Sequence, residues 1–122
     1  MDIQRLAAGG VGLVLTLAAA AGYYTGSDTL VVFTVNALHN HIHLASGVLG
    51  LVCALLFSGL HARLFNKWFG AIYALVGVLG FVLPSLMAEW LNIGLADNLL
   101  HLAIGLGLVY VAVKIRPEPS YN

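Results

Sequence analysis

The chain has 122 residues, of which 61% are hydrophobic and only 8% are charged, and its formal net charge is zero. A soluble domain carries roughly 25% charged residues, and one of this length has too small an interior to bury so much apolar side chain. The neutral balance excludes a basic nucleic-acid surface, the single Cys53 excludes an intramolecular disulfide, and lipid is the predicted solvent.

Four apolar segments are long enough to cross a bilayer. A helix needs about 20 residues to span the hydrocarbon core, where it must satisfy its own backbone hydrogen bonds. The expected spans are residues 6–24, 37–60, 69–86 (with Pro84 near its end) and 93–115. The sequence therefore predicts an all-α, four-transmembrane-helix bundle. It forms a single membrane domain over 1–116, followed by a short, disordered cytoplasmic tail at 117–122.

The charged residues predict the orientation of the bundle. The acidic residues on one side of the predicted membrane are Asp28, between the first and second spans, and Glu89 and Asp97, near the junction of the third and fourth. We expect Glu89 and Asp97 to be solvated loop charges. All basic residues fall on the opposite side of the predicted membrane: Arg5, Arg63, Lys67, Lys114 and Arg116. The positive-inside rule then places both termini and the predicted 61–67 loop in the cytoplasm.

The two halves of the chain resemble each other. A shift of 58 residues aligns Arg5 with Arg63, and it also aligns Gly12 with Gly70, Gly22 with Gly80, Asn40 with Asn98 and His43 with His101. We interpret this as a duplication, with repeats at about 2–58 and 60–116. Both repeats have the same topology, so two pseudo-symmetric helical hairpins are expected around an axis along the membrane normal. His43 and His101 would then lie at equal depth, close to that axis.

Polar residues form a stripe on the second and fourth spans. Residues three or four apart share one face of a helix, and polar groups at membrane depth normally face the bundle interior. His41 points away from this face. The stripe consists of Asn36, His39, Asn40 and His43 on the second span and of Asn98 and His101 on the fourth.

Several roles for this stripe remain open. In the structural alternative, Asn and His form hydrogen bonds across helices or to backbone groups freed at the helix starts, or Asn36 and Asn98 cap helix starts. In the metal alternative, His39 and His43 clamp a Zn or Cu ion with His101 as third ligand. Asp97 or an Asn would then orient one of the rings.

Two further alternatives involve His43 and His101. With Asn40 and Asn98 beside them, these histidines are candidates to ligate a haem, or one could hold a chlorophyll. No basic residue on that side would meet haem propionates. Proton or small-solute conduction is the last alternative, but no ionisable residue continues the stripe beyond Gly47. The outer segments 28–36 and 87–96 are apolar for loops, and their pattern does not decide their structure.

The chain resembles a family of small four-helix bacterial membrane proteins that carries only a domain-of-unknown-function label. The resemblance rests on the pattern Asn-x-x-His-x-x-x-Gly at 40–47 and 98–105, and on FGAIYALVGVLGF at 69–81. It implies the four-helix fold and the bacterial plasma membrane, and it implies no activity. The sequence thus favours a non-enzymatic scaffold or accessory subunit, packed in the lipid bilayer with itself or with other membrane subunits. A cofactor or metal carrier is the alternative.

Overall fold

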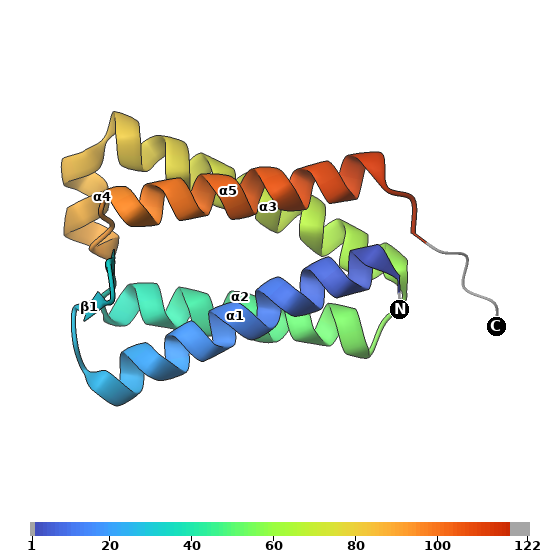
Figure 1. Ribbon diagram of the computed structural model, residues 1–122, viewed down its shortest axis with the longest axis horizontal. Helices are drawn as coiled ribbons and strands as arrows, with labels where there is room; N and C mark the ends of the chain where they lie inside the picture. The colour runs from blue at the N-terminus through green and yellow to red at the C-terminus, as the bar shows by residue number, and fades with distance from the viewer. Residues whose placement is uncertain (1, 118–122) are drawn as a thin grey trace.

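The computed structural model describes residues 2–117, so the predicted tail lies outside the described residues from position 118 onward. Four of its helices are long and apolar enough to cross a membrane, which confirms the predicted all-α fold (Figure 1). These helices are α1 (Ile3–Thr25), α2 (Ala37–Leu55), α3 (Gly59–Val82) and α5 (Leu95–Lys114). The chain adds a short helix, α4 (Pro84–Leu91), and two short strands, β1 (Thr29–Leu30) and β2 (Phe33–Thr34).

The third span differs from its prediction at both ends. It begins at Gly59 rather than at residue 69, so the predicted 61–67 loop is helical. The charged side chain of Arg63 is accommodated in this helix because its Nε donates to the carbonyl of Ala112, 2.7 Å away, near the end of α5. The span ends at Val82 because Pro84 lacks an N–H and cannot continue a helix. Proline is favoured at a first helical position, and Pro84 instead begins α4.

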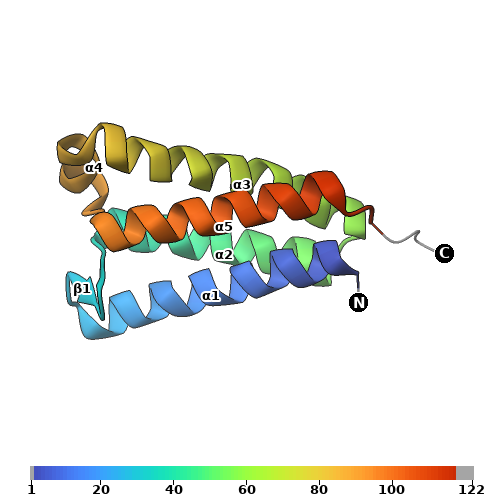
Figure 2. The same ribbon diagram turned by 45° about the horizontal axis from the view of Figure 1, so that its top comes forward.

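The strands and α4 lie together at one end of the bundle, and the start of α1 and the end of α5 lie at the other (Figures 1 and 2). We call these the capped end and the terminal end. The antiparallel hairpin pairs Thr29 with Thr34, and it is tied to α4 and the segment after it. Nδ2 of Asn36 donates to the carbonyl of Trp90 over 2.9 Å, and Nδ2 of Asn92 donates to that of Val35 over 2.8 Å. The two outer segments, undecided from sequence, thus form one cap.

The long helices form two closely packed pairs, α1 with α2 and α3 with α5. Glycines allow this approach. A Cβ added to Gly12 would lie 2.8 Å from the carbonyl oxygen of Gly47, and one added to Gly70 would lie 2.8 Å from that of Gly105. Small residues at such positions let membrane helices pack backbone against backbone. The two contacts involve positions 58 residues apart, although a duplication at 2–58 and 60–116 stays a prediction.

Fully buried amides join the pairs at the terminal end. Nε2 of Gln4 donates to the carbonyls of Val111 and Ile115 over 2.8 and 2.6 Å. Nδ2 of Asn66 in turn donates to the backbone and side-chain oxygens of Gln4, each over 2.9 Å. This network links α1, α3 and α5. It holds the two helix pairs together at the terminal end, away from the polar stripe.

We expect Gly105→Ala to lower the free energy of unfolding by about 1–3 kcal/mol, since overpacking a tight contact has that cost. Its new Cβ would lie 2.6 Å from the carbonyl oxygen of Gly70. Gly107→Ala on the same helix is the matched control, because no atom lies within 4 Å of its added Cβ. Unfolding in detergent micelles measures both variants. Equal stabilities would contradict the role given to the glycine contact.

Candidate metal centre

Three imidazoles meet between the helix pairs near the capped end. His39 and His43 are one turn apart on α2, and His101 comes from α5. The ring centroid of His39 lies 4.3 Å from that of His43 and 5.7 Å from that of His101, and the centroids of His43 and His101 are 6.3 Å apart. Their exposed fractions are only 2%, 8% and 5% in chain order. The structure therefore brings together all three residues that the sequence suggests as metal ligands.

The orientation of His39 leaves one nitrogen free for a ligand. Its Nδ1 lies 2.9 Å from the carbonyl oxygen of Leu91, at the end of α4. Because a carbonyl only accepts, this contact assigns the hydrogen to Nδ1 and the lone pair to Nε2. Nε2 is buried and has no hydrogen-bond partner among residues 2–117. A backbone carbonyl behind a histidine is a common way to orient a metal ligand.

His43 and His101 also carry unpartnered nitrogens. Neither nitrogen of His43 has a hydrogen-bond partner within the described part of the chain, nor does Nδ1 of His101. Leaving a buried polar group unpaired costs free energy, and native structures rarely do so without a reason. The structural alternative predicts that His43 is bonded across helices or to freed backbone groups, and the structure contains no such bond among residues 2–117. These nitrogens are free to bind something else.

The spacing of the nitrogens fits a single ion. One ligand nitrogen from each of the three histidines can be chosen so that all lie within 4.8 Å of one another. Imidazole binds zinc at 2.0–2.1 Å, so two nitrogens at tetrahedral angles around one ion lie about 3.4 Å apart. Small side-chain rotations would close that difference. Three histidines would leave one coordination position open.

Asp97 is buried beside this cluster, contrary to the expected solvated charge. Only 4% of it is exposed, and it lies in the first turn of α5. Its Oδ2 accepts hydrogen bonds from the backbone N–H of Gly94 (2.9 Å) and from the N–H and hydroxyl of Thr34 (3.1 and 2.9 Å). The carboxylate lines a cavity together with His43 and His101. A buried negative charge at this position favours a cation nearby.

The predicted asparagines of the site have other surroundings. Asn40 packs against Gly22, and Asn98 packs against Gly80, so that neither glycine has room for a Cβ. No hydrogen bond joins either amide to an imidazole in the stretch from residue 2 to 117. Asn36 does cap α2, since its Oδ1 accepts from the N–H of His39 over 2.9 Å. Asn98 is not a cap, because α5 has Gly94 at that position.

A tetrapyrrole does not fit between the paired histidines. The ring of His39, 4.3 and 5.7 Å from the other two, occupies the space beside the His43–His101 axis that a flat macrocycle would need. The two cavities that adjoin these rings measure about 170 and 230 Å³. Both are smaller than the roughly 300 Å³ at which pockets for drug-sized ligands begin. The cluster therefore suits an ion better than haem or chlorophyll.

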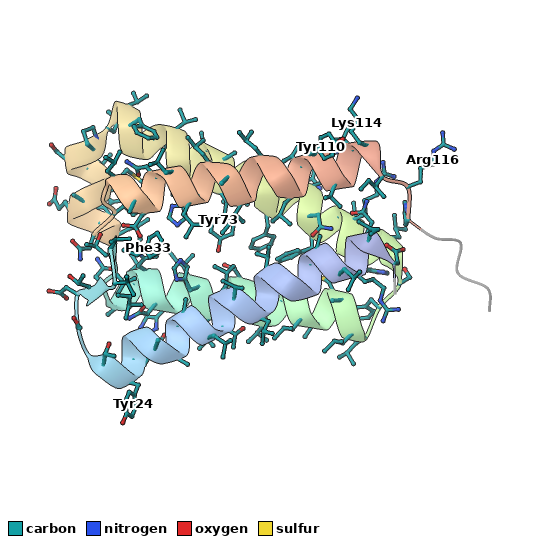
Figure 3. All side chains as sticks on the ribbon, viewed as in Figure 1. Tyr24, Phe33, Tyr73, Tyr110, Lys114 and Arg116 are labelled. Carbon is teal, nitrogen blue, oxygen red and sulfur yellow. The ribbon has the colours of Figure 1, made fainter. Side chains whose placement is uncertain are left out.

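Sequence reasoning missed several contributors to the site. Tyr73 of α3 is directed into the space between the helix pairs, whereas Tyr24 points outward (Figure 3). The centroid of the Tyr73 ring lies 5.7 Å from that of the His101 ring. A lone hydroxyl in an apolar span is a signal that could have identified Tyr73. The contributions of Thr34 and of the Leu91 carbonyl had no such signal, because both depend on how the cap folds.

Comparison with known proteins gives a family and no function. No curated protein and no solved structure matches the chain. The family model described as "Domain of unknown function (DUF4383)" matches residues 5–114, from the first turn of α1 to the end of α5, and so includes all three histidines. The chain belongs to this family of small membrane proteins of unknown function.

Proposed function

We propose that this protein holds one transition-metal ion, zinc or copper, at the centre formed by His39, His43 and His101. The observation that supports this is the convergence of three buried imidazoles whose nitrogens lack hydrogen-bond partners in residues 2–117. Imidazole suits both metals, and neither a thiolate nor a second carboxylate is needed to complete a three-histidine set. We assign no reaction to the centre, so the proposal takes up the alternative of a metal carrier, and the absence of enzymatic activity stays a prediction.

The charges near the centre support a cation. Neutral imidazoles contribute no charge, so a divalent ion would be offset in part by the buried carboxylate of Asp97. The basic residues are far from this end: Figure 3 shows Lys114 and Arg116 at the terminal end. Arg5 lies in the first turn of α1, and Arg63 and Lys67 lie in the first three turns of α3, in the same half of the bundle. Within residues 2–117, no lysine or arginine side chain competes for the site.

The ligands come from both helix pairs, which gives the ion a structural effect. His39 and His43 belong to the α1–α2 pair, and His101 belongs to the α3–α5 pair. An ion bound to all three would join the pairs at the capped end, as the Gln4–Asn66 network does at the terminal end. A ligand that binds only the folded state stabilises it in proportion to its affinity and concentration.

Other expected roles stay predictions. Large apolar side chains are exposed along every long helix, which suits acyl chains and partner helices equally. This surface therefore leaves open a scaffold, an accessory subunit or a homo-oligomer. Conduction would require polar groups to continue from Ser46 toward the Gln4–Asn66 network, and the facing helices offer mainly apolar residues there.

We also propose that the terminal end faces the cytoplasm of a bacterial cell, with the four long helices in its plasma membrane. All five basic residues lie in the half of the bundle at this end, which is the asymmetry that the positive-inside rule describes. The metal centre would then lie toward the outer leaflet.

Purified protein is expected to bind about one zinc or copper ion per chain by elemental analysis, and His43→Leu and His101→Leu are expected to lose it. His41→Leu is the control, because His41 lies on the same helix but is exposed and bonded to Tyr23. Acidification should release the ion, since protons compete for the ligand nitrogens.

Without metal, His43→Leu should be no less stable than the wild type, because it breaks no hydrogen bond. A metal-free wild type, or a Soret band in its absorption spectrum, would contradict the proposal.

We expect Asp97→Asn to weaken metal affinity by about 10- to 100-fold, the range found when groups behind metal ligands are changed. The variant keeps the shape of the side chain and removes its charge. Glu89→Gln, on the exposed side of α4, is the matched control and should bind as the wild type does. Competition against a fluorescent zinc chelator measures all three proteins. Equal affinity of Asp97→Asn and wild type would show that the carboxylate serves only to hold Thr34 and Gly94.

Labelling with a membrane-impermeant maleimide tests the orientation. In a Cys53→Ala background, Ser27→Cys marks the capped end and Ser58→Cys the terminal end, and both positions are exposed. We expect intact spheroplasts to label at residue 27 and to label at residue 58 only after permeabilisation. The reverse pattern would overturn the assignment of the cytoplasmic face.

A further inference from the structure

A cavity of about 170 Å³ adjoins the three histidines between α2 and α3. Its walls are apolar and include Phe69 and Val76 of α3. Tyr73 and Ser46 line the cavity beside the three histidines, and the Tyr73 hydroxyl is buried there without a hydrogen-bond partner among residues 2–117. An apolar wall with unpartnered polar groups buried behind one end suits a molecule with an apolar body and a polar tip.

The lining of the cavity reaches the side of the bundle. Two of its lining residues, Ile42 of α2 and Ile72 of α3, lie on the outer surface with exposed fractions of 41% and 51%. Both belong to helices that are long and apolar enough to cross the bilayer. A molecule that enters between these side chains would therefore come from the lipid.

The depth of the histidines fits the head group of such a molecule. His43 is six residues beyond Ala37 at the start of α2, and His101 is six residues beyond Leu95 at the start of α5. At a rise of 1.5 Å per residue, both lie about 9 Å below their helix starts. This depth corresponds to the boundary between lipid head groups and acyl chains, where amphipathic rings are enriched.

An ion held by the three histidines would lie beside this cavity. All three histidines line it, whereas the cavity on the opposite side, between α1 and α5, is lined by His43, His101 and Asp97 without His39. An ion held by the three rings would therefore have the carboxylate on one side and the α2–α3 cavity on the other. A ligand oxygen in this cavity could reach the ion, and the Tyr73 hydroxyl would be beside it.

We propose that the α2–α3 cavity binds the ring of a membrane quinone, with one ring oxygen directed at the metal and Tyr73. A volume of about 170 Å³ accommodates a single substituted ring and excludes a whole phospholipid. Phe69 and Tyr73 supply aromatic surfaces for such a ring, and the isoprenoid tail would leave between Ile42 and Ile72 into the bilayer. The inference rests on the proposed metal centre, because the ion provides the principal contact to the oxygen.

Cobalt-loaded protein in detergent tests the inference, because the visible bands of Co²⁺ report on its fourth ligand. Decylubiquinone is expected to shift these bands in a saturable manner, and decylbenzene, which lacks the ring oxygens, is not. Val76→Trp fills the cavity and should weaken the response at least tenfold while one Co²⁺ per chain remains bound. Ile104→Trp is the matched control, because this half-buried residue lines the opposite cavity and should leave the response unchanged.

The outcomes separate the two proposals. A wild type that binds no Co²⁺ removes the metal centre and the quinone contact with it. Stoichiometric Co²⁺ with unshifted bands, or an equal response in Val76→Trp, overturns the quinone site and leaves the metal centre standing. Equal shifts with decylbenzene would also overturn it. Should Val76→Trp not fold, Ile42→Trp fills the same cavity from α2 and gives the same test.

Discussion

The structure depends on one constraint of the hydrocarbon phase, which is that every polar side chain within it must be directed inward. The chain satisfies this constraint at two levels between the helix pairs. At the terminal end, Gln4 and Asn66 bond to each other and to the carbonyls of α5. At the capped end, three imidazoles meet, and four of their ring nitrogens have no hydrogen-bond partner among residues 2–117. The first cluster is a structural contact, and the second has the character of a binding site.

The packing of the helices explains why the site lies where it does. Within each pair, glycines bring the backbones so close that an added methyl group would collide with a carbonyl. Between the pairs, larger side chains keep the helices apart and leave cavities on both sides of His43 and His101. Tight pairs with a looser junction concentrate any ligand binding at the junction. A bound ion would therefore act on the relative position of two rigid units.

Much of this arrangement could be predicted from the sequence. The spans follow from hydropathy, and the convergence of His39, His43 and His101 follows from helical spacing and the inward direction of polar groups. The start of α3 was missed because Arg63 lowers the local hydropathy, although its guanidinium bonds to a carbonyl at the end of α5. The burial of Asp97 was missed because its donors include Thr34, which is distant in sequence. Folding of the cap, on which both Thr34 and Leu91 depend, has no periodic signature.

The end of α4 has an effect beyond its own helix. Asn92 terminates α4 in a left-handed conformation, with φ 51° and ψ 46°, which asparagine tolerates better than most residues. This reversal fixes the carbonyl of Leu91 that accepts from His39. The left-handed conformation of one residue in the cap thus determines which nitrogen of the buried His39 ring carries its hydrogen.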